Sequence, residues 1–400
     1  SNHCIISLIR YNQELGIRKR SLSTLYYPKH PLEEELRRLA QESEAPVEMD
    51  LCIDVAYEAL RKSTHAVRVR TIALAVGFCT YAARLVESIG VRESFITTLP
   101  GKGALAHKIL ALVTPIIFND YLKNNHIPSL TDIQTLAESA LEILKHVEFH
   151  TYTTEGSRDD KKVMDITTKL ISNFIFEIRE IERLLQLNIS KCSVLTEHYM
   201  VDFDLHIAGA PDLVIECLEP KPRAVVIEWK TYGRPTPYEW EKVQAYTYAI
   251  LEARRLGYGL RKGLHSKVDF DELFKALASS NPKDVAVVPL IIRENGSYSN
   301  HPAYPRAAQR VLQEEELKQL LRNIVIAAAH LTLLRTDYIS LAGYDNEDFD
   351  RRYCTVRIKD YEGRLLRWTP RALEHHGIPS DRDKSWVCKI CQELHLAMPL

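Results

Sequence analysis

The chain has 400 residues, of which 46% are hydrophobic and 26% charged, and its formal net charge is −1. This balance is typical of a globular protein with two or three structural units, and it disfavours a protein that coats polyanions without specificity. A local basic groove remains compatible with it. No apolar run approaches the roughly 18 residues of a membrane span, and the Ser-Asn start carries no targeting signal, so we expect a cytoplasmic protein without membrane contact.

The first part of the chain has helical patterns. Residues 1–75, with segments such as "PLEEELRRLAQESE", are expected to form a helical N-terminal region. Residues 76–335 are expected to form the central domain, which starts with helices up to about residue 145. A polar loop over 150–162 and an amphipathic helix over 163–190 follow.

After this helix the pattern changes to β-branched residues broken by Gly and Pro. It predicts a short meander with "LEPKPR" as the hairpin turn, followed by the helix "PYEWEKVQAYTYAILEARRLG". The strand "DVAVVPLIIR" and the helix "QEEELKQLLRNIVIAAAHLTLL" come next, and residues 336–400 form a polar, cysteine-bearing tail. This order predicts an α/β fold in which helices flank a central sheet.

An acid and a base stand out in the apolar strand "AVVIEWK". Glu228 and Lys230 are two residues apart, so they point to the same face of the strand. The predicted hairpin sets Asp212 beside Glu228. Two adjacent carboxylates repel, and a hard divalent cation relieves that repulsion. The sequence therefore predicts a Mg²⁺ or Mn²⁺ site, and an added imidazole from His107 favours Mn²⁺.

These residue types suit the hydrolysis of a phosphodiester. The metal polarises the phosphate and lowers the pKa of a bound water, while Lys230 orients that water or stabilises the developing charge. Gln244 and Tyr248 lie four residues apart on one helix face, where they can support the site. Each feature alone is common by chance or explained by packing, but their joint order favours a nuclease site.

At this point the chain resembles the RecB-like branch of the PD-(D/E)XK nucleases, through "GALAH", "GAPDLVI", "VVIEWK" and "QAYTY". The resemblance implies the restriction-endonuclease-like core, with a mixed central sheet. It also implies a role for each matching residue: metal ligation by His107, Asp212, Glu228 and the Trp229 carbonyl, catalysis by Lys230 with the two carboxylates, and completion of the site by Gln244 and Tyr248. The most similar members are the CRISPR-associated RecB-like exonucleases of the Cas-four type.

Relatives of this kind often hold an iron–sulfur cluster on one Cys before the His motif and three near the C-terminus. Cys79, Cys388 and Cys391 match three of these ligands, whereas the remaining position is Ala397. Cys354 or His395 is the candidate for the fourth ligand. A [4Fe-4S] cluster, a zinc site and no metal at all stay open. The other cysteines are expected to be buried thiols, since disulfides have little use in such a chain.

The expected function is a Mg²⁺- or Mn²⁺-dependent deoxyribonuclease, acting as an exonuclease on single-stranded DNA or DNA ends. The resemblance implies a role in CRISPR adaptation and antiviral defence, with CRISPR integration proteins as partners. One alternative is a DNA-repair nuclease of the same branch. Two others come from different classes: an inactive nuclease-like scaffold that binds DNA or proteins, and an interaction protein whose only metal sits on the cysteines.

Overall fold

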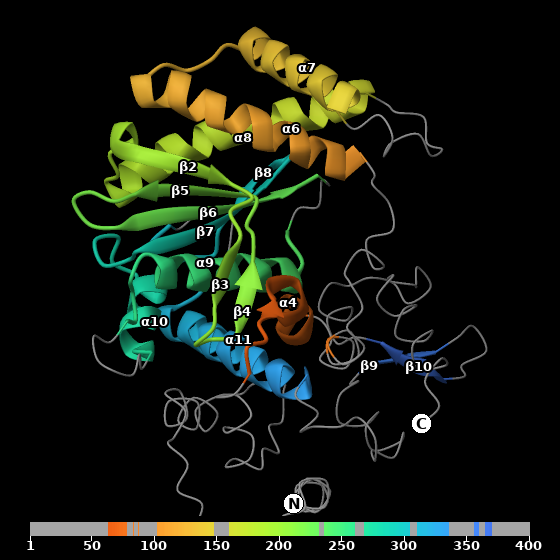
Figure 1. Cartoon of the computed structure of the whole chain (residues 1–400), viewed down its shortest axis with the longest axis vertical. Helices are drawn as coiled ribbons and strands as arrows, with labels where there is room; N and C mark the ends of the chain where they lie inside the picture. Colours follow the sequence, from red (N-terminus) through yellow and green to blue (C-terminus); the bar gives the residue numbers. More distant parts are fainter. Residues whose placement is uncertain are drawn as a thin grey trace, which may run out of the picture.

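The computed structural model describes residues 63–77, 83, 87, 102–147, 160–231, 236–260, 268–304, 310–335, 356–359 and 365–369. Within these residues the protein is a mixed α/β structure with mixed sheets, which confirms the predicted class (Figure 1). The helical calls on residues 1–62 lie outside the described residues, as does most of the tail.

The main sheet has five strands in the order β2-β5-β6-β7-β8. These strands are β2 (Cys192–Thr196), β5 (Leu213–Cys217), β6 (Arg223–Lys230), β7 (Val287–Arg293) and β8 (Gly296–Tyr298). As predicted, β5 and β6 form an antiparallel hairpin around "LEPKPR". The β6 and β7 strands run parallel, and their connection contains α9 (Glu239–Arg255) and α10 (Phe270–Ala278). A parallel pair needs such a crossover because a tight turn cannot join it.

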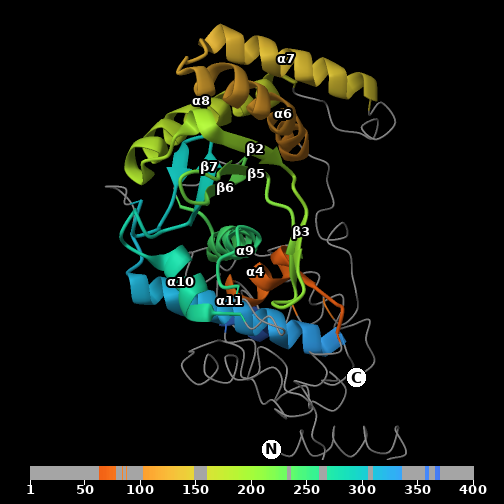
Figure 2. The ribbon, with the colours of Figure 1, turned by 60° about the vertical axis from the view of Figure 1, so that its left-hand side comes forward.

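Helices cover both faces of this sheet (Figures 1 and 2). One face is covered by α6 (Lys102–Ile116), α7 (Leu130–Val147) and α8 (Asp160–Leu185). On the other face lies α9, backed by α4 (Val69–Gly77), α10 and α11 (Glu314–Arg335). Side chains along β6 alternate between the two faces of the sheet. Ile227 and Trp229 lie in the core shared with α6 and α8, and Val226 lies in the core shared with α9. Glu228 therefore points to the α9 side of the sheet.

A smaller three-stranded sheet stands beside α9, in the order β1-β4-β3. It consists of β1 (Val67–Arg68), β4 (Ile207–Gly209) and β3 (Met200–Asp202). Further along the chain, β9 (Val356–Lys359) and β10 (Leu365–Thr369) form an antiparallel pair. The short helical segments η3 (Ile117–Tyr121), η4 (Leu122–Asn124) and η5 (Ile189–Lys191) complete the described elements.

Two boundaries differ from the sequence prediction. The helix α8 begins at Asp160, inside the segment predicted as a loop, and Asp160 forms an ion pair with Lys145 of α7. The helix α4 runs through the boundary expected after residue 75. Its residues Val69 and Ile72 are buried in the same core as α9 and α11, so this segment packs with the central domain.

One helical stretch, Gly103–Asn124, is long and apolar enough by length and composition to cross a membrane, although no such run was expected. Half of its most apolar 18-residue segment is buried inside the structure. The core helix of a globular protein meets the same criterion. Here the stretch includes α6, and Ile109 and Leu110 of that helix lie in the core with α8.

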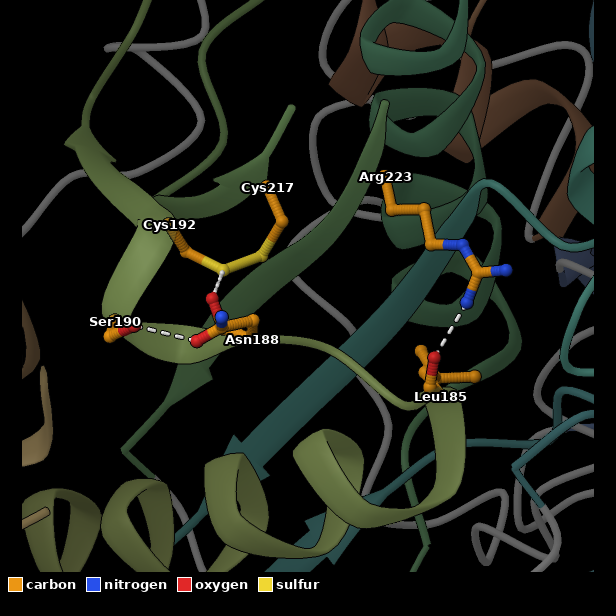
Figure 3. The surroundings of a disulfide bond; sticks show 6 residues. All are labelled: Leu185, Asn188, Ser190, Cys192, Cys217 and Arg223. Carbon is orange, nitrogen blue, oxygen red and sulfur yellow. Dashed lines mark hydrogen bonds between the residues drawn. A yellow bond between two sulfur atoms is a disulfide. The ribbon is translucent and has the colours of Figure 1, made fainter. Parts of the chain in front are cut away.

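The expectation of unpaired cysteines is wrong for one pair. Cys192 and Cys217 are buried as predicted, but they face each other across the β2–β5 ladder and form a disulfide bond (Figure 3). Their Cα atoms are 4.2 Å apart. The strand register creates this pairing, and spacing along the sequence does not reveal it. Nearby, the Arg223 guanidinium donates to the Leu185 carbonyl oxygen at 2.6 Å and ties the end of α8 to the start of β6.

Candidate active site

The predicted residues converge at one end of the main sheet. Asp212 directly precedes β5, and Glu228 and Lys230 lie at the end of the antiparallel β6, so the hairpin brings all three to the same edge. The first half of α9 contributes Gln244 from the face below the sheet, and α6 contributes His107 from the layer above. Four separate elements therefore build the site.

Asp212 is held by donors from two directions. Its Oδ1 lies 3.1 Å from Nδ1 of His107, and its Oδ2 accepts a hydrogen bond of 2.8 Å from the backbone N–H of Trp229. The Trp229 side chain is buried under α8, where its ring packs edge-on against Phe174 at 5.8 Å between centroids. The contact of Trp229 with the site thus runs through its backbone, and the ring anchors that backbone to the core.

Glu228 is almost fully buried and connects the two sides of the site. Its Oε1 lies 3.4 Å from the backbone N–H of Asp212, and its Oε2 accepts a hydrogen bond of 3.0 Å from Nε2 of Gln244. The Lys230 ammonium lies 3.4 Å from the same Oε2 and 3.5 Å from Oε1 of Gln244. The amide of Gln244 therefore fixes both the acid and the base.

Two glycines in the motifs allow these elements to approach closely. A side-chain carbon at Gly103 would lie 2.8 Å from Oγ1 of Thr231, so glycine lets the start of α6 approach the residue after β6 without moving the threonine side chain. A side-chain carbon at Gly209 would lie 2.8 Å from both the Tyr248 ring and Val69. The Gly residues of "GALAH" and "GAPD" thus have packing roles that bring His107 and Asp212 into place.

The ionisation of the site is uneven. Burial raises the pKa of Asp212, but the charge and hydrogen bond of His107 lower it more, so the Asp212 pKa lies below its usual value. Burial lowers the pKa of His107, whereas the Asp212 carboxylate raises it above its usual value. Burial and then the charge of Asp212 raise the pKa of Glu228 to about 7. The contact with His107 therefore favours the ionised form of Asp212, whereas burial disfavours the ionised form of Glu228.

The donor set was tested for a divalent cation. Two carboxylates and an imidazole are the right ligand types, and the raised pKa of Glu228 is the response of a second carboxylate that lacks enough positive charge. Among the described residues, however, no group of three or more His, Cys, Asp or Glu side chains is arranged to hold a metal ion. The carboxylate oxygens contact protein donors instead. The residue types suit a cation, and these contacts would have to rearrange to admit one.

Tyr248 is buried at the back of the site. Burial and then the charge of Glu228 raise its pKa well above the usual value, and its hydroxyl is hydrogen-bonded to Gln244. It therefore orients Gln244 and acts as a neutral phenol.

Three residues near the site were missed by sequence reasoning. The Trp240 ring lies 5.7 Å from the Lys230 ammonium, measured to the ring centroid, which is a cation–π contact. The buried Glu241 carboxylate accepts from the Tyr238 backbone N–H at 2.9 Å and adds negative charge near Lys230. Arg70 of α4 adds positive charge near Glu228. The "EWE" start of α9 was a visible signal for the first two, whereas Arg70 had none.

The cysteine ligands predicted for a cluster, Cys79, Cys354, Cys388 and Cys391, all lie outside the described residues. Comparison with known proteins adds no further constraint on the site. No family model matches the chain, and no curated protein matches it. The geometry of this site is therefore the basis for assigning a function.

Proposed function

We propose that the protein is a metal-dependent DNA nuclease with a PD-(D/E)XK site of the RecB-like branch. The observation that carries the proposal is the juxtaposition of His107 on α6 with Asp212, Glu228 and Lys230 of the β5–β6 hairpin, although His107 and Asp212 are 105 residues apart in the sequence. Packing alone does not require two carboxylates, an imidazole and an ammonium at one nearly buried edge, because burying such groups is costly. Their arrangement is suited to phosphodiester hydrolysis.

In the proposed mechanism, Asp212, Glu228 and His107 would hold Mg²⁺ or Mn²⁺, and the Trp229 carbonyl would be a further ligand. When bound, the cation polarises the scissile phosphate and makes a bound water more acidic. Lys230 orients the attacking water and stabilises the charge that develops on the phosphate oxygens. Gln244 keeps the Lys230 ammonium and the Glu228 carboxylate in register, supported by the Tyr248 hydroxyl.

A second candidate is a catalytically silent scaffold with the same fold. The contacts of the carboxylate oxygens with His107, Trp229 and Gln244 favour it, since they already satisfy the groups that a metal would need. Titration with Mn²⁺ by calorimetry separates the two candidates. A nuclease should bind Mn²⁺ in the parent protein and lose this binding in Asp212→Asn, whereas a silent scaffold should show no difference between the two.

Cleavage of labelled single-stranded DNA with Mn²⁺ tests the catalytic assignment. Lys230→Ala should reduce the cleavage rate by about 10²–10³-fold, the usual effect of losing one group that stabilises transition-state charge. The matched control is Lys191→Ala, because Lys191 is half exposed and pairs with Glu219 at the opposite end of the hairpin. Equal cleavage by the parent and Lys230→Ala would show that the site assignment is wrong.

A further inference from the structure

The small β1-β4-β3 sheet has one face on the core and one face turned outward. Val67 and Ile207 are paired in register and fully buried, which marks the face packed on α9. The next residues along the strands, Arg68, Ala208 and Val201, are also in register and therefore share the opposite face. Arg68 is exposed and Val201 is 39% exposed, whereas the small Ala208 between them is buried.

Two aromatic residues extend this outward face. Tyr199 and Phe203 lie two residues before and after Val201, and they are 66% and 61% exposed. Tyr199 directly precedes β3 and Phe203 begins the turn that follows it, so the two exposed rings flank Val201 at the two ends of the strand. Beside them, the free edge of β3 borders a hollow of about 480 Å³, which the exposed Leu260 also lines. Exposed aromatic faces of this kind are surfaces on which unpaired bases stack.

The segment that leads into this face is hydrogen-bonded to the candidate active site. The backbone N–H of Glu197, two residues before Tyr199, donates to the carbonyl oxygen of Asp212 at 3.2 Å. On the β1 side, Arg70 in the first turn of α4 is exposed. The pKa of Glu228 is raised by burial and by Asp212, and the charges of Lys230 and Arg70 oppose that rise, so Arg70 lies within electrostatic reach of the site.

We propose that this face binds single-stranded nucleic acid and leads it into the site, with bases stacked on Tyr199 and Phe203 and phosphates held by Arg68 and Arg70. The inference rests on the proposed nuclease function, because it treats the carboxylate cluster as the point where the strand ends. It adds a binding surface to that function, built from residues outside the catalytic cluster.

The charges around the hollow determine how the strand lies. Asp202 and Asp204 line the hollow, and both pair with Arg254, at 2.6 and 3.0 Å. Arg255 lines the hollow as well and pairs with Glu216 and Glu252, so each guanidinium there faces two carboxylates and the charge around the hollow favours neutral bases over phosphates. The exposed Arg68 lies on the other edge strand of the sheet. The backbone therefore follows β1 and α4, and the bases reach across to β3.

Fluorescence anisotropy with a labelled oligothymidylate tests the surface, using the full chain with a chelator so that no cleavage occurs. Tyr199→Ala and Phe203→Ala should each raise the Kd at least about fivefold, from the stacking contribution of one base. Tyr199→Trp should bind as the parent does. The matched control is Phe176→Ala, because this aromatic residue on α8 is 59% exposed but lies on the far side of the main sheet.

The salt dependence of binding and a duplex control distinguish phosphate contacts from base stacking. Arg68→Gln should lower the slope of log Kd against log salt by about 0.7, the value for one lost phosphate contact on a single strand. The aromatic variants should bind duplex DNA as the parent does, because paired bases are not free to stack. A peptide strand on the free edge of β3 is the rival occupant, and in that case the parent would not bind the oligothymidylate.

Absence of binding by the parent, or an unchanged Kd in the double variant Tyr199→Ala/Phe203→Ala, would overturn the proposal. If Lys230→Ala still cleaves, the nuclease assignment fails, and the binding measurements still decide whether this surface exists.

Discussion

His107 and Asp212 are 105 residues apart in the sequence, yet Nδ1 of the imidazole lies 3.1 Å from Oδ1 of the carboxylate. The contact joins the helical layer above the sheet to the edge of β5. It lowers the pKa of Asp212 against the effect of burial, which keeps one carboxylate of the site ionised beside a second one. Lys230 and the Trp229 backbone N–H lower the same pKa, but each does so less than His107.

The first prediction concerns His107 as a metal ligand. His107→Ala should weaken Mn²⁺ binding by about 10–100-fold, the range seen when a group that orders a metal site is removed. Calorimetric titration of the full chain measures the affinity. His146→Ala is the matched control, because His146 is exposed on α7. An unchanged Mn²⁺ affinity in His107→Ala would contradict a role in metal binding.

The second prediction concerns Trp240 as a positioning residue. Its ring faces the Lys230 ammonium at 5.7 Å, so its loss should free the ammonium and lower kcat while KM stays unchanged. A cation–π contact of this kind corresponds to a loss of about 2- to 30-fold in kcat for Trp240→Leu. Trp240→Tyr should restore most of the rate, since it keeps an aromatic face. If KM rises with kcat unchanged, Trp240 contacts the substrate instead.

The third prediction concerns the packing of α4 on α9. A side-chain carbon at Gly77 would lie 2.4 Å from the Cα atom of Trp240, and backbone atoms cannot move aside as a flexible side chain does. Gly77→Ala should therefore destabilise the protein by roughly 1–3 kcal/mol. In a helix that packs against nothing, replacing glycine with alanine is stabilising. The sign of the change in the free energy of unfolding therefore shows whether the close approach exists. Urea unfolding measures it, and an unchanged or higher midpoint would contradict the close approach.

The fourth prediction concerns pH and the buried His301. Burial lowers its pKa from 6.5 to about 4. Its Nε2 lies 2.6 Å from the Leu277 carbonyl oxygen, and its Nδ1 accepts from the Ala303 backbone N–H at 3.0 Å, so the folded state holds a neutral ring. Between pH 6.5 and 4 the unfolded state binds the extra proton. The stability contribution is therefore intact above pH 6.5 and is lost as the pH falls towards 4, by roughly 3 kcal/mol.

Urea unfolding of the parent and His301→Gln at several pH values measures this contribution. The free energy of unfolding should fall more steeply with acid in the parent than in the variant over that window. The comparison removes the effect of other titrating groups, which both proteins share. Parallel pH profiles would show that His301 is not held neutral in the folded protein.

Several features followed from local sequence patterns. The alternation in "AVVIEWK" predicted the strand and the shared face of Glu228 and Lys230, because side chains two apart in a strand point the same way. The Pro-rich "LEPKPR" predicted the hairpin that sets Asp212 near Glu228. The helical spacing in α9 predicted that Gln244 and Tyr248 lie together. Each of these depends on geometry within a few residues or one turn.

Other features depended on how distant elements pack, and no local signal carried them. The contact of His107 with Asp212, the Trp240 ring beside Lys230, the charge of Arg70 and the Cys192–Cys217 bond all follow from helix placement and strand register. A sequence shows which side chains are available and which face each one takes on its own element. Only tertiary packing decides which faces meet. The reason is that many side chains are buried together in the two cores, and no single residue determines how the helices and strands are placed.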